Sequence, residues 1–164
     1  MLPDRRPHTS TIRPMIGPFQ ALLLAFPVAL FPAALVTDIT YLNTAEIQWT
    51  NFSAWLLAGG ELFTGLLLIA ALVSLVRRRS GRAVVYFLLV LALFVVGLLN
   101  SFQHSGDGWA SVGTFGLILS LLGAVLALAA GALGYASRTV AATADPDWQR
   151  PDAHDRTHPV ELAR

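Results

Sequence analysis

Apolar residues along this chain are gathered into long blocks instead of recurring at a helical or strand period. Four blocks are each long enough to cross a bilayer, because at ~1.5 Å per residue about 20 residues span a hydrocarbon core of roughly 30 Å. Unbroken apolar runs of this length are typical of membrane-spanning helices. We therefore predict an all-α polytopic membrane protein, an antiparallel four-helix transmembrane bundle, with spans at about 19–37, 53–76, 83–101 and 112–135.

Polar segments flank this transmembrane domain, which we place at residues 18–136. Residues 1–17 are predicted to form a cytoplasmic N-terminal segment. Residues 137–164 mix Pro, Asp, Arg and His without periodicity, which predicts a disordered cytoplasmic tail. A signal peptide is the alternative for the first apolar block, since basic residues precede it. The length of that block, its two prolines and the lack of a clear A-x-A cleavage site argue against this alternative.

Arginine placement predicts the topology. All eleven basic residues are arginine: three precede the first block, four lie between the second and third, and four follow the fourth. The two other connections contain none. Because cytoplasmic loops carry the excess of basic residues, both termini and the second connection are predicted to face the cytoplasm. The residues that set this orientation at the second connection are Arg77, Arg78, Arg79 and Arg82.

Composition narrows the function classes. The absence of cysteine excludes disulfides, thiolate metal sites and covalent attachment of a c-type haem. The sequence contains no phosphate-binding loop, dinucleotide-binding fingerprint, H-E-x-x-H or G-x-S-x-G motif. The arginines sit next to apolar spans, where they suit orientation and contact with anionic lipid, so we expect the lipid bilayer and no nucleic acid as a partner. An enzyme is the least supported class.

Glu61 is the one charged residue inside the second span. A carboxylate at that depth costs several kcal/mol unless it is paired, hydrated or protonated, so it is a candidate functional group. Its helical neighbours Ala58, Thr64 and Gly65 are small or polar, which predicts that Glu61 faces the bundle. Two interpretations remain open. Glu61 is either a protonated or hydrogen-bonded structural residue, or a group that handles protons or binds a ligand.

Further polar residues gather where antiparallel spans would meet at the outer face. Asp38 and Tyr41 follow the first span, and Asn100 and His104 end the third. They would line an outward-facing polar cavity above Glu61, and we group these four residues with Glu61 as a candidate polar cluster. The alternative is that they are ordinary interfacial residues that satisfy helix ends. Pro27 and Pro32 each remove a backbone donor and are predicted to kink the first span.

No cofactor is identifiable. His104 is the single histidine near the membrane, whereas bis-histidine haem ligation needs two, which leaves a quinone or another mode of haem binding open. A metal site would require partners such as Asp38, Asp107 or Glu46. Gly123, Ala127 and Gly131 form a stripe of small residues, which permits close packing within the chain, with a second copy in a homo-oligomer, or with another membrane protein.

Several segments together resemble a known family. They are FPVALFPAALVTDITY, then W-x-x-F-S-x-W-L-L-A-x-G, an arginine loop, LLN, and the glycine-rich LSLLGAVLALAAGALGY. Over about residues 16–136 the chain resembles the bacterial four-span membrane family catalogued as domain of unknown function 2231. The resemblance implies a multi-pass protein of the bacterial inner membrane with no established activity. Typical members have a His-Pro element before the first span and a histidine early in the third. Neither is present here, so a haem or metal role does not carry over.

Two functional classes remain. The first is a non-catalytic accessory or interaction protein of the inner membrane, with electron-transport machinery as one possible neighbour. The basis for it is a set of packing motifs without a complete catalytic constellation. The alternative is a small transporter or a protein that binds a lipophilic ligand, using Glu61 and Asp38.

Overall fold

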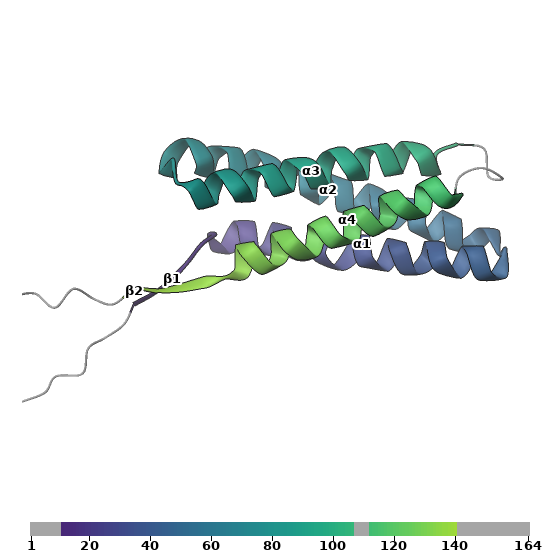
Figure 1. The fold of residues 1–164 in the computed structure, drawn as a ribbon, viewed down its shortest axis with the longest axis horizontal. Helices are drawn as coiled ribbons and strands as arrows, with labels where there is room; N and C mark the ends of the chain where they lie inside the picture. Colours follow the sequence, from purple (N-terminus) through teal and green to yellow (C-terminus); the bar gives the residue numbers. More distant parts are fainter. Residues whose placement is uncertain (1–10, 107–111, 141–164) are drawn as a thin grey trace, which may run out of the picture. The chain divides into compact units, whose positions relative to one another are not determined.

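The computed structural model describes residues 11–106 and 112–140. It contains four helices, each long and apolar enough to cross a membrane (Figure 1). This confirms the predicted all-α membrane fold. The helices are α1 (Pro18–Thr44), α2 (Ile47–Arg78), α3 (Gly81–His104) and α4 (Thr114–Tyr135).

The chain divides into two compact units, and the four helices belong to the one formed by Pro14–Ala136. Within this unit the helices pack in cyclic order, so that α1 contacts α2 and α4, and α3 also contacts α2 and α4. Figure 1 shows α1 beside α4 and α2 beside α3. Short connections make successive helices antiparallel, as predicted, and they gather the arginine connection and the start of α1 at one end of the bundle.

The helices extend beyond the predicted spans, most clearly between the first two. The spans predicted at about 19–37 and 53–76 leave residues 38–52 as a connection, but α1 continues to Thr44 and α2 begins at Ile47. Side chains of Thr40, Asn43 and Thr44 donate hydrogen bonds to carbonyls one turn earlier, at 2.8 Å in each case. The polar residues are therefore accommodated on the helix. The chain reverses at Ala45, which adopts a left-handed conformation (φ 55°).

The arginine connection is equally short. Arg79 closes α2 in a left-handed conformation (φ 42°), and the Ser80 hydroxyl accepts a hydrogen bond from the Ala83 N–H at 3.3 Å to cap α3. The Arg78 guanidinium reaches across to the segment before α1 and donates to the Met15 carbonyl at 2.8 Å. These contacts position the start of α1 beside the end of α2.

Small residues let α4 approach α1 closely. A Cβ atom at Gly123 would lie 2.9 Å from the Phe31 ring, and one at Gly131 would lie 2.9 Å from Val28. Ala127 is fully buried between these two glycines. The stripe of small residues was predicted to pack within the chain, against a second copy, or against another membrane protein. The structure shows that it packs within the chain. Helix α1 continues through Pro27 and Pro32 without ending, and the predicted kinks stay predictions.

The second unit comprises Met1–Arg13 and Ser137–Arg164. Two short strands that the sequence pattern did not predict, β1 (Thr11–Pro14) and β2 (Ser137–Val140), pair as a two-stranded sheet. Residues 137–140 thus have regular structure within the segment predicted as a disordered tail. The rest of that segment, together with most of the predicted N-terminal segment, lies outside the described residues.

Candidate functional site

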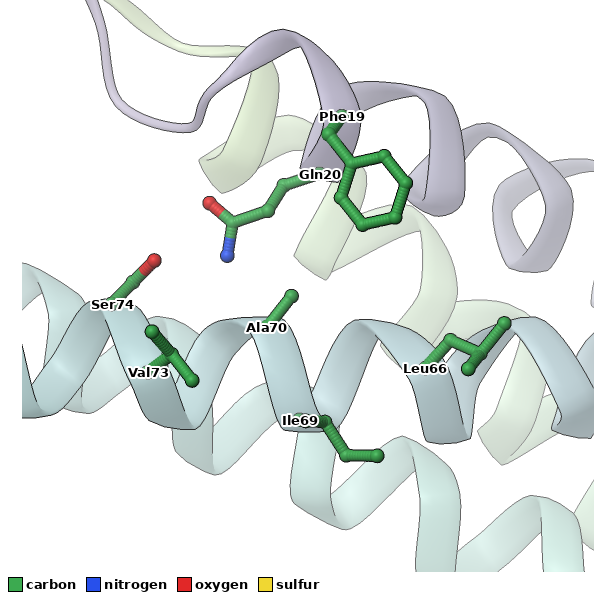
Figure 2. Close-up of a pocket in the computed structure, with 7 residues that line it drawn as sticks. All are labelled: Phe19, Gln20, Leu66, Ile69, Ala70, Val73 and Ser74. Atoms are coloured by element: carbon green, nitrogen blue, oxygen red, sulfur yellow. The ribbon is translucent and has the colours of Figure 1, made fainter.

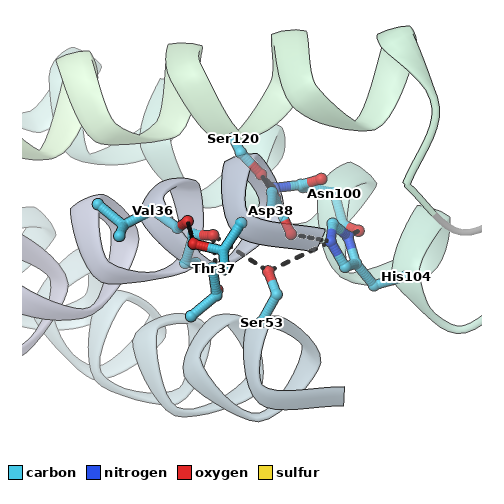
Figure 3. Close-up of polar contacts among 9 residues, drawn as sticks. Val36, Thr37, Asp38, Ser53, Asn100, His104 and Ser120 are labelled. Atoms are coloured by element: carbon cyan, nitrogen blue, oxygen red, sulfur yellow. Dashed lines mark hydrogen bonds and ion pairs between the residues drawn. The ribbon is translucent and has the colours of Figure 1, made fainter. Parts of the chain in front are cut away.

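An Asp–His pair lies inside the bundle near the end opposite the arginines. Asp38 Oδ1 in α1 and His104 Nε2, on the last residue of α3, are 2.9 Å apart (Figure 3). Both side chains are buried, Asp38 completely. Such a pair withdrawn from water is stable only when its remaining donors and acceptors are also satisfied.

Both ring nitrogens of His104 have partners within the bundle. The ring Nδ1 lies 2.9 Å from the Asn100 carbonyl, which only accepts, so Nδ1 carries a hydrogen. The ring Nε2 is also 3.3 Å from Ser53 Oγ, whose own hydrogen can go to the Ala34 carbonyl at 3.4 Å. With Ser53 oriented in this way, its oxygen accepts from Nε2. Nε2 thus lies within contact of both Ser53 Oγ and Asp38 Oδ1.

Asn100 and Ser120 complete the network from the other side. The Asn100 amide donates to Ser120 Oγ at 2.8 Å, and the Ser120 hydroxyl donates in turn to Asp38 Oδ2. One side chain from α1, one from α2, two from α3 and one from α4 therefore meet at a single carboxylate. We call Asp38, Ser53, Asn100, His104 and Ser120 the polar network.

The geometry of the polar network differs from that of a nucleophilic relay. In a Ser–His–Asp triad the serine and the carboxylate contact opposite nitrogens of the imidazole. Here Ser53 and Asp38 both contact Nε2, and Nδ1 is held by a backbone carbonyl. The imidazole therefore cannot pass a proton from Ser53 to Asp38 across its ring. Among the described residues no group of three His, Cys, Asp or Glu side chains is placed to hold a metal ion.

Of the five residues predicted to form the polar cluster, the structure brings Asp38, Asn100 and His104 together. Tyr41 lies half-exposed one turn further along α1, and its backbone carbonyl accepts the Ala45 N–H. Glu61 lies apart from the network. Sequence reasoning missed Ser53 and Ser120, whose only signal is a hydroxyl within an apolar span.

Glu61 occupies a tight, apolar position on α2. It is 9% exposed, and neither carboxyl oxygen has a hydrogen-bond partner among the described residues. Its Oε1 lies so close to Gly97 of α3 that a Cβ there would be 1.8 Å away, and the Phe31 ring lies against the same glycine. Glu61 therefore faces the interior of the bundle, as predicted.

Glu61 and the polar network lie against the same face of α3 at different levels. Gly97 and Asn100 are three residues apart and so share a face of that helix, about 4.5 Å apart along its axis. Asn100 Oδ1 is itself buried without a partner among the described residues. The structure thus contains a hydrogen-bonded Asp–His pair toward one end of the bundle and, about one turn deeper on α3, a carboxyl group without a partner among the described residues.

Comparison with known families gives a match over residues 17–144 to the family described as "Predicted membrane protein (DUF2231)". The chain belongs to the DUF2231 family. This confirms the resemblance inferred from the sequence, and the DUF2231 match covers all four helices and every residue of the polar network. No curated protein and no solved structure matches the chain.

The contact between Glu61 and Gly97 generates a prediction. Gly97→Ala should lower the free energy of unfolding by about 1–3 kcal/mol, because the added methyl group overlaps both Oε1 and the Phe31 ring. Unfolding in mild detergent, followed by loss of helical circular dichroism, measures the effect. Gly59→Ala is the matched control, since its Cβ would make an ordinary 3.4 Å contact with Leu30. Equal stability of the two variants would contradict the assigned packing.

Proposed function

We propose that this protein binds and releases a proton at Glu61, and that this step is linked to movement of α2 against α3. The proposal places it in the class of small transporters and proteins that bind lipophilic ligands. The single observation that carries it is a carboxyl group in the middle of the bundle whose two oxygens have no hydrogen-bond partner among the described residues.

Burial favours the neutral acid at this position. An ionised carboxylate without a counter-ion or a hydrogen-bond donor in a membrane interior costs several kcal/mol, whereas the protonated acid carries no charge. The Asp38 carboxylate differs, because it accepts from Ser120 and contacts His104. We therefore assign a proton to Glu61 in the closed bundle.

Loss of the proton would require the bundle to open. Both carboxyl oxygens are buried and Oε1 lies against Gly97, so the closed bundle does not expose them to the water that a carboxylate needs. Hydration of the charged form therefore requires α2 and α3 to separate at this level. Proton release and helix separation are then coupled, since the ionised form of Glu61 is stable only in the open bundle. In this way a buried carboxyl group can drive a conformational change.

We place the protein in the bacterial inner membrane with both termini in the cytoplasm. Support comes from the arginines of the 77–82 connection, which lie at the same end of the bundle as the start of α1 and the end of α4. Basic residues concentrate on the cytoplasmic side of inner-membrane proteins. In this orientation the polar network lies toward the outer face and Glu61 lies deeper.

Infrared spectroscopy tests the proposal directly. Purified protein should show the carbonyl band of a protonated carboxyl group at neutral pH, and Glu61→Gln should lack that band. The linked movement can be followed with a single cysteine, since the chain has none of its own. Thr64→Cys lies one turn from Glu61 on the same buried face of α2. It should react with a water-soluble maleimide only at alkaline pH, when Glu61 has lost its proton.

Two controls separate opening of the bundle from the ordinary effect of pH on a thiol. In the Glu61→Gln background the Thr64→Cys thiol should stay protected at every pH. Ala130→Cys, fully buried in the other half of the bundle, should stay protected in both backgrounds. An ionised Glu61 at neutral pH, or a Thr64→Cys reactivity that is unchanged by Glu61→Gln, would contradict the proposal.

A second candidate is a non-catalytic accessory protein of the membrane. It is favoured by the polar network, whose donors are directed at groups within the bundle and whose geometry is not that of a relay. The described residues contain no feature that points to electron-transport machinery, so no partner is named. Photo-crosslinking from exposed positions of α4, such as Ile118 and Val125, should give one adduct of fixed mass. Crosslinks to lipid alone at every position would contradict this candidate.

A further inference from the structure

A groove between α1 and α2 begins at Leu66, about 7.5 Å along α2 from Glu61, and extends toward the arginine end of the bundle. It has a volume of about 390 Å³ and is lined mainly by apolar side chains. Figure 2 shows the first turn of α1 facing the last third of α2 across it. The lining residues are Phe19, Gln20, Leu66, Ile69, Ala70, Val73 and Ser74. From Leu66 to Ser74 the groove follows α2 for about 12 Å.

One polar group in this groove is unsatisfied. Gln20 is 8% exposed, and its Nε2 has no hydrogen-bond partner among the described residues. In Figure 2 its amide points into the space between the helices, and the Ser74 hydroxyl points toward it. A buried amide N–H₂ without an acceptor is costly, so this position suits a molecule that brings an acceptor such as a carbonyl oxygen.

Positive charge lies at the end of the same groove. Arg77 and Arg78 follow Ser74 by three and four residues, which places them on the same side of α2, about 4.5–6 Å further along its axis. Arg78 uses one guanidinium donor for the Met15 carbonyl, which draws it toward the start of α1. Arg77 is exposed. Along the groove toward the arginine end, an apolar stretch is therefore followed by an amide without a hydrogen-bond acceptor and then by two arginine side chains.

We propose that this groove is a binding site for one anionic glycerophospholipid of the bilayer. An acyl chain fits the apolar stretch beside Leu66 and Ile69. The glycerol ester carbonyl, a short spacer from the phosphate, accepts from Gln20 Nε2. The phosphate then meets Arg77 and Arg78, where basic residues at a membrane surface attract anionic head groups. A quinone supplies carbonyl oxygens without the anion, and a zwitterionic lipid adds a cation beside the phosphate.

Native mass spectrometry of the full chain, released from mild detergent with defined lipid added, tests the proposal. The probes are phosphatidylglycerol, phosphatidylcholine of the same acyl chains, and a long-chain ubiquinone. One molecule of phosphatidylglycerol should remain bound at concentrations that leave the other two unbound. Equal retention of phosphatidylcholine, or preferential retention of the quinone, would overturn the assignment.

Substitutions of groove residues test whether the lipid binds in the groove. Gln20→Leu removes the amide at similar size and should weaken retention about fivefold, the value of one ordinary hydrogen bond. Arg77→Gln should reduce the preference for phosphatidylglycerol over phosphatidylcholine. Ala70→Phe fills the apolar stretch and should abolish retention, whereas Ala129→Phe makes the same change on a half-buried position of α4 and should not.

Two further measurements keep the outcome clear. Each variant must retain helical circular dichroism and elute as a single species, and Gln20→Leu serves if Ala70→Phe does not fold. Glu61→Gln should bind phosphatidylglycerol like the parent protein, so failure of the proton proposal leaves this one intact. Retention unaffected by both Gln20→Leu and Arg77→Gln would show that the lipid binds elsewhere and would overturn the proposal.

Discussion

A buried carboxylate has to be satisfied inside the molecule, and Asp38 is the residue of this bundle to which that requirement applies most strictly. Its two oxygens are matched by His104 and Ser120, and His104 also contacts Ser53 and the Asn100 carbonyl. Because these partners come from α2, α3 and α4, hydrogen bonding at one α1 residue fixes the relative position of all four helices. The two hydrophobic clusters of the bundle consist of apolar side chains, which constrain register less than directional hydrogen bonds do.

Glu61 is a second buried carboxyl group, and its surroundings differ from those of Asp38. The same type of group, placed deeper in the bundle, has Gly97 and an aromatic ring for neighbours and no hydrogen-bond donor among the described residues. Proteins retain such groups at functional positions more readily than at structural ones, because a structural position is equally well filled by an apolar residue. In our proposal the two acids therefore have different roles, with Asp38 fixing the helix arrangement and Glu61 changing charge when the helices move.

Much of the fold could be predicted because hydrophobic blocks of membrane length have few alternative structures. The ends of the helices could not be predicted. The composition around Thr40, Asn43 and Thr44 indicated a loop, but their side chains donate hydrogen bonds to carbonyls of the same helix, which lets the helix continue. Part of the candidate site followed from antiparallel geometry, which brings Asp38 near Asn100 and His104. The separation of Glu61 was also within reach, since it lies about 12 Å along α2 from Ser53.

What could not be predicted depends on side-chain register between helices. Nothing in the local sequence distinguishes Ser53 or Ser120 from other hydroxyl residues of apolar spans, and only the packing shows that they contact the Asp–His pair. The need for glycine at position 97 is also invisible in the sequence. It arises because the Glu61 carboxyl occupies the space that a side chain there would fill. The unsatisfied Gln20 amide is likewise visible only once α1 lies beside α2.

The most direct test of this account is a double-mutant cycle on Asp38 and His104, measured as the free energy of unfolding in mixed detergent. Asp38→Asn and His104→Ala should each cost about 2 kcal/mol or more, because each leaves a buried partner uncompensated. The double variant should lose little beyond either single one, which gives a coupling energy above about 1 kcal/mol. Losses that add to within about 0.5 kcal/mol would show that the two residues act independently and would contradict the role assigned to the polar network.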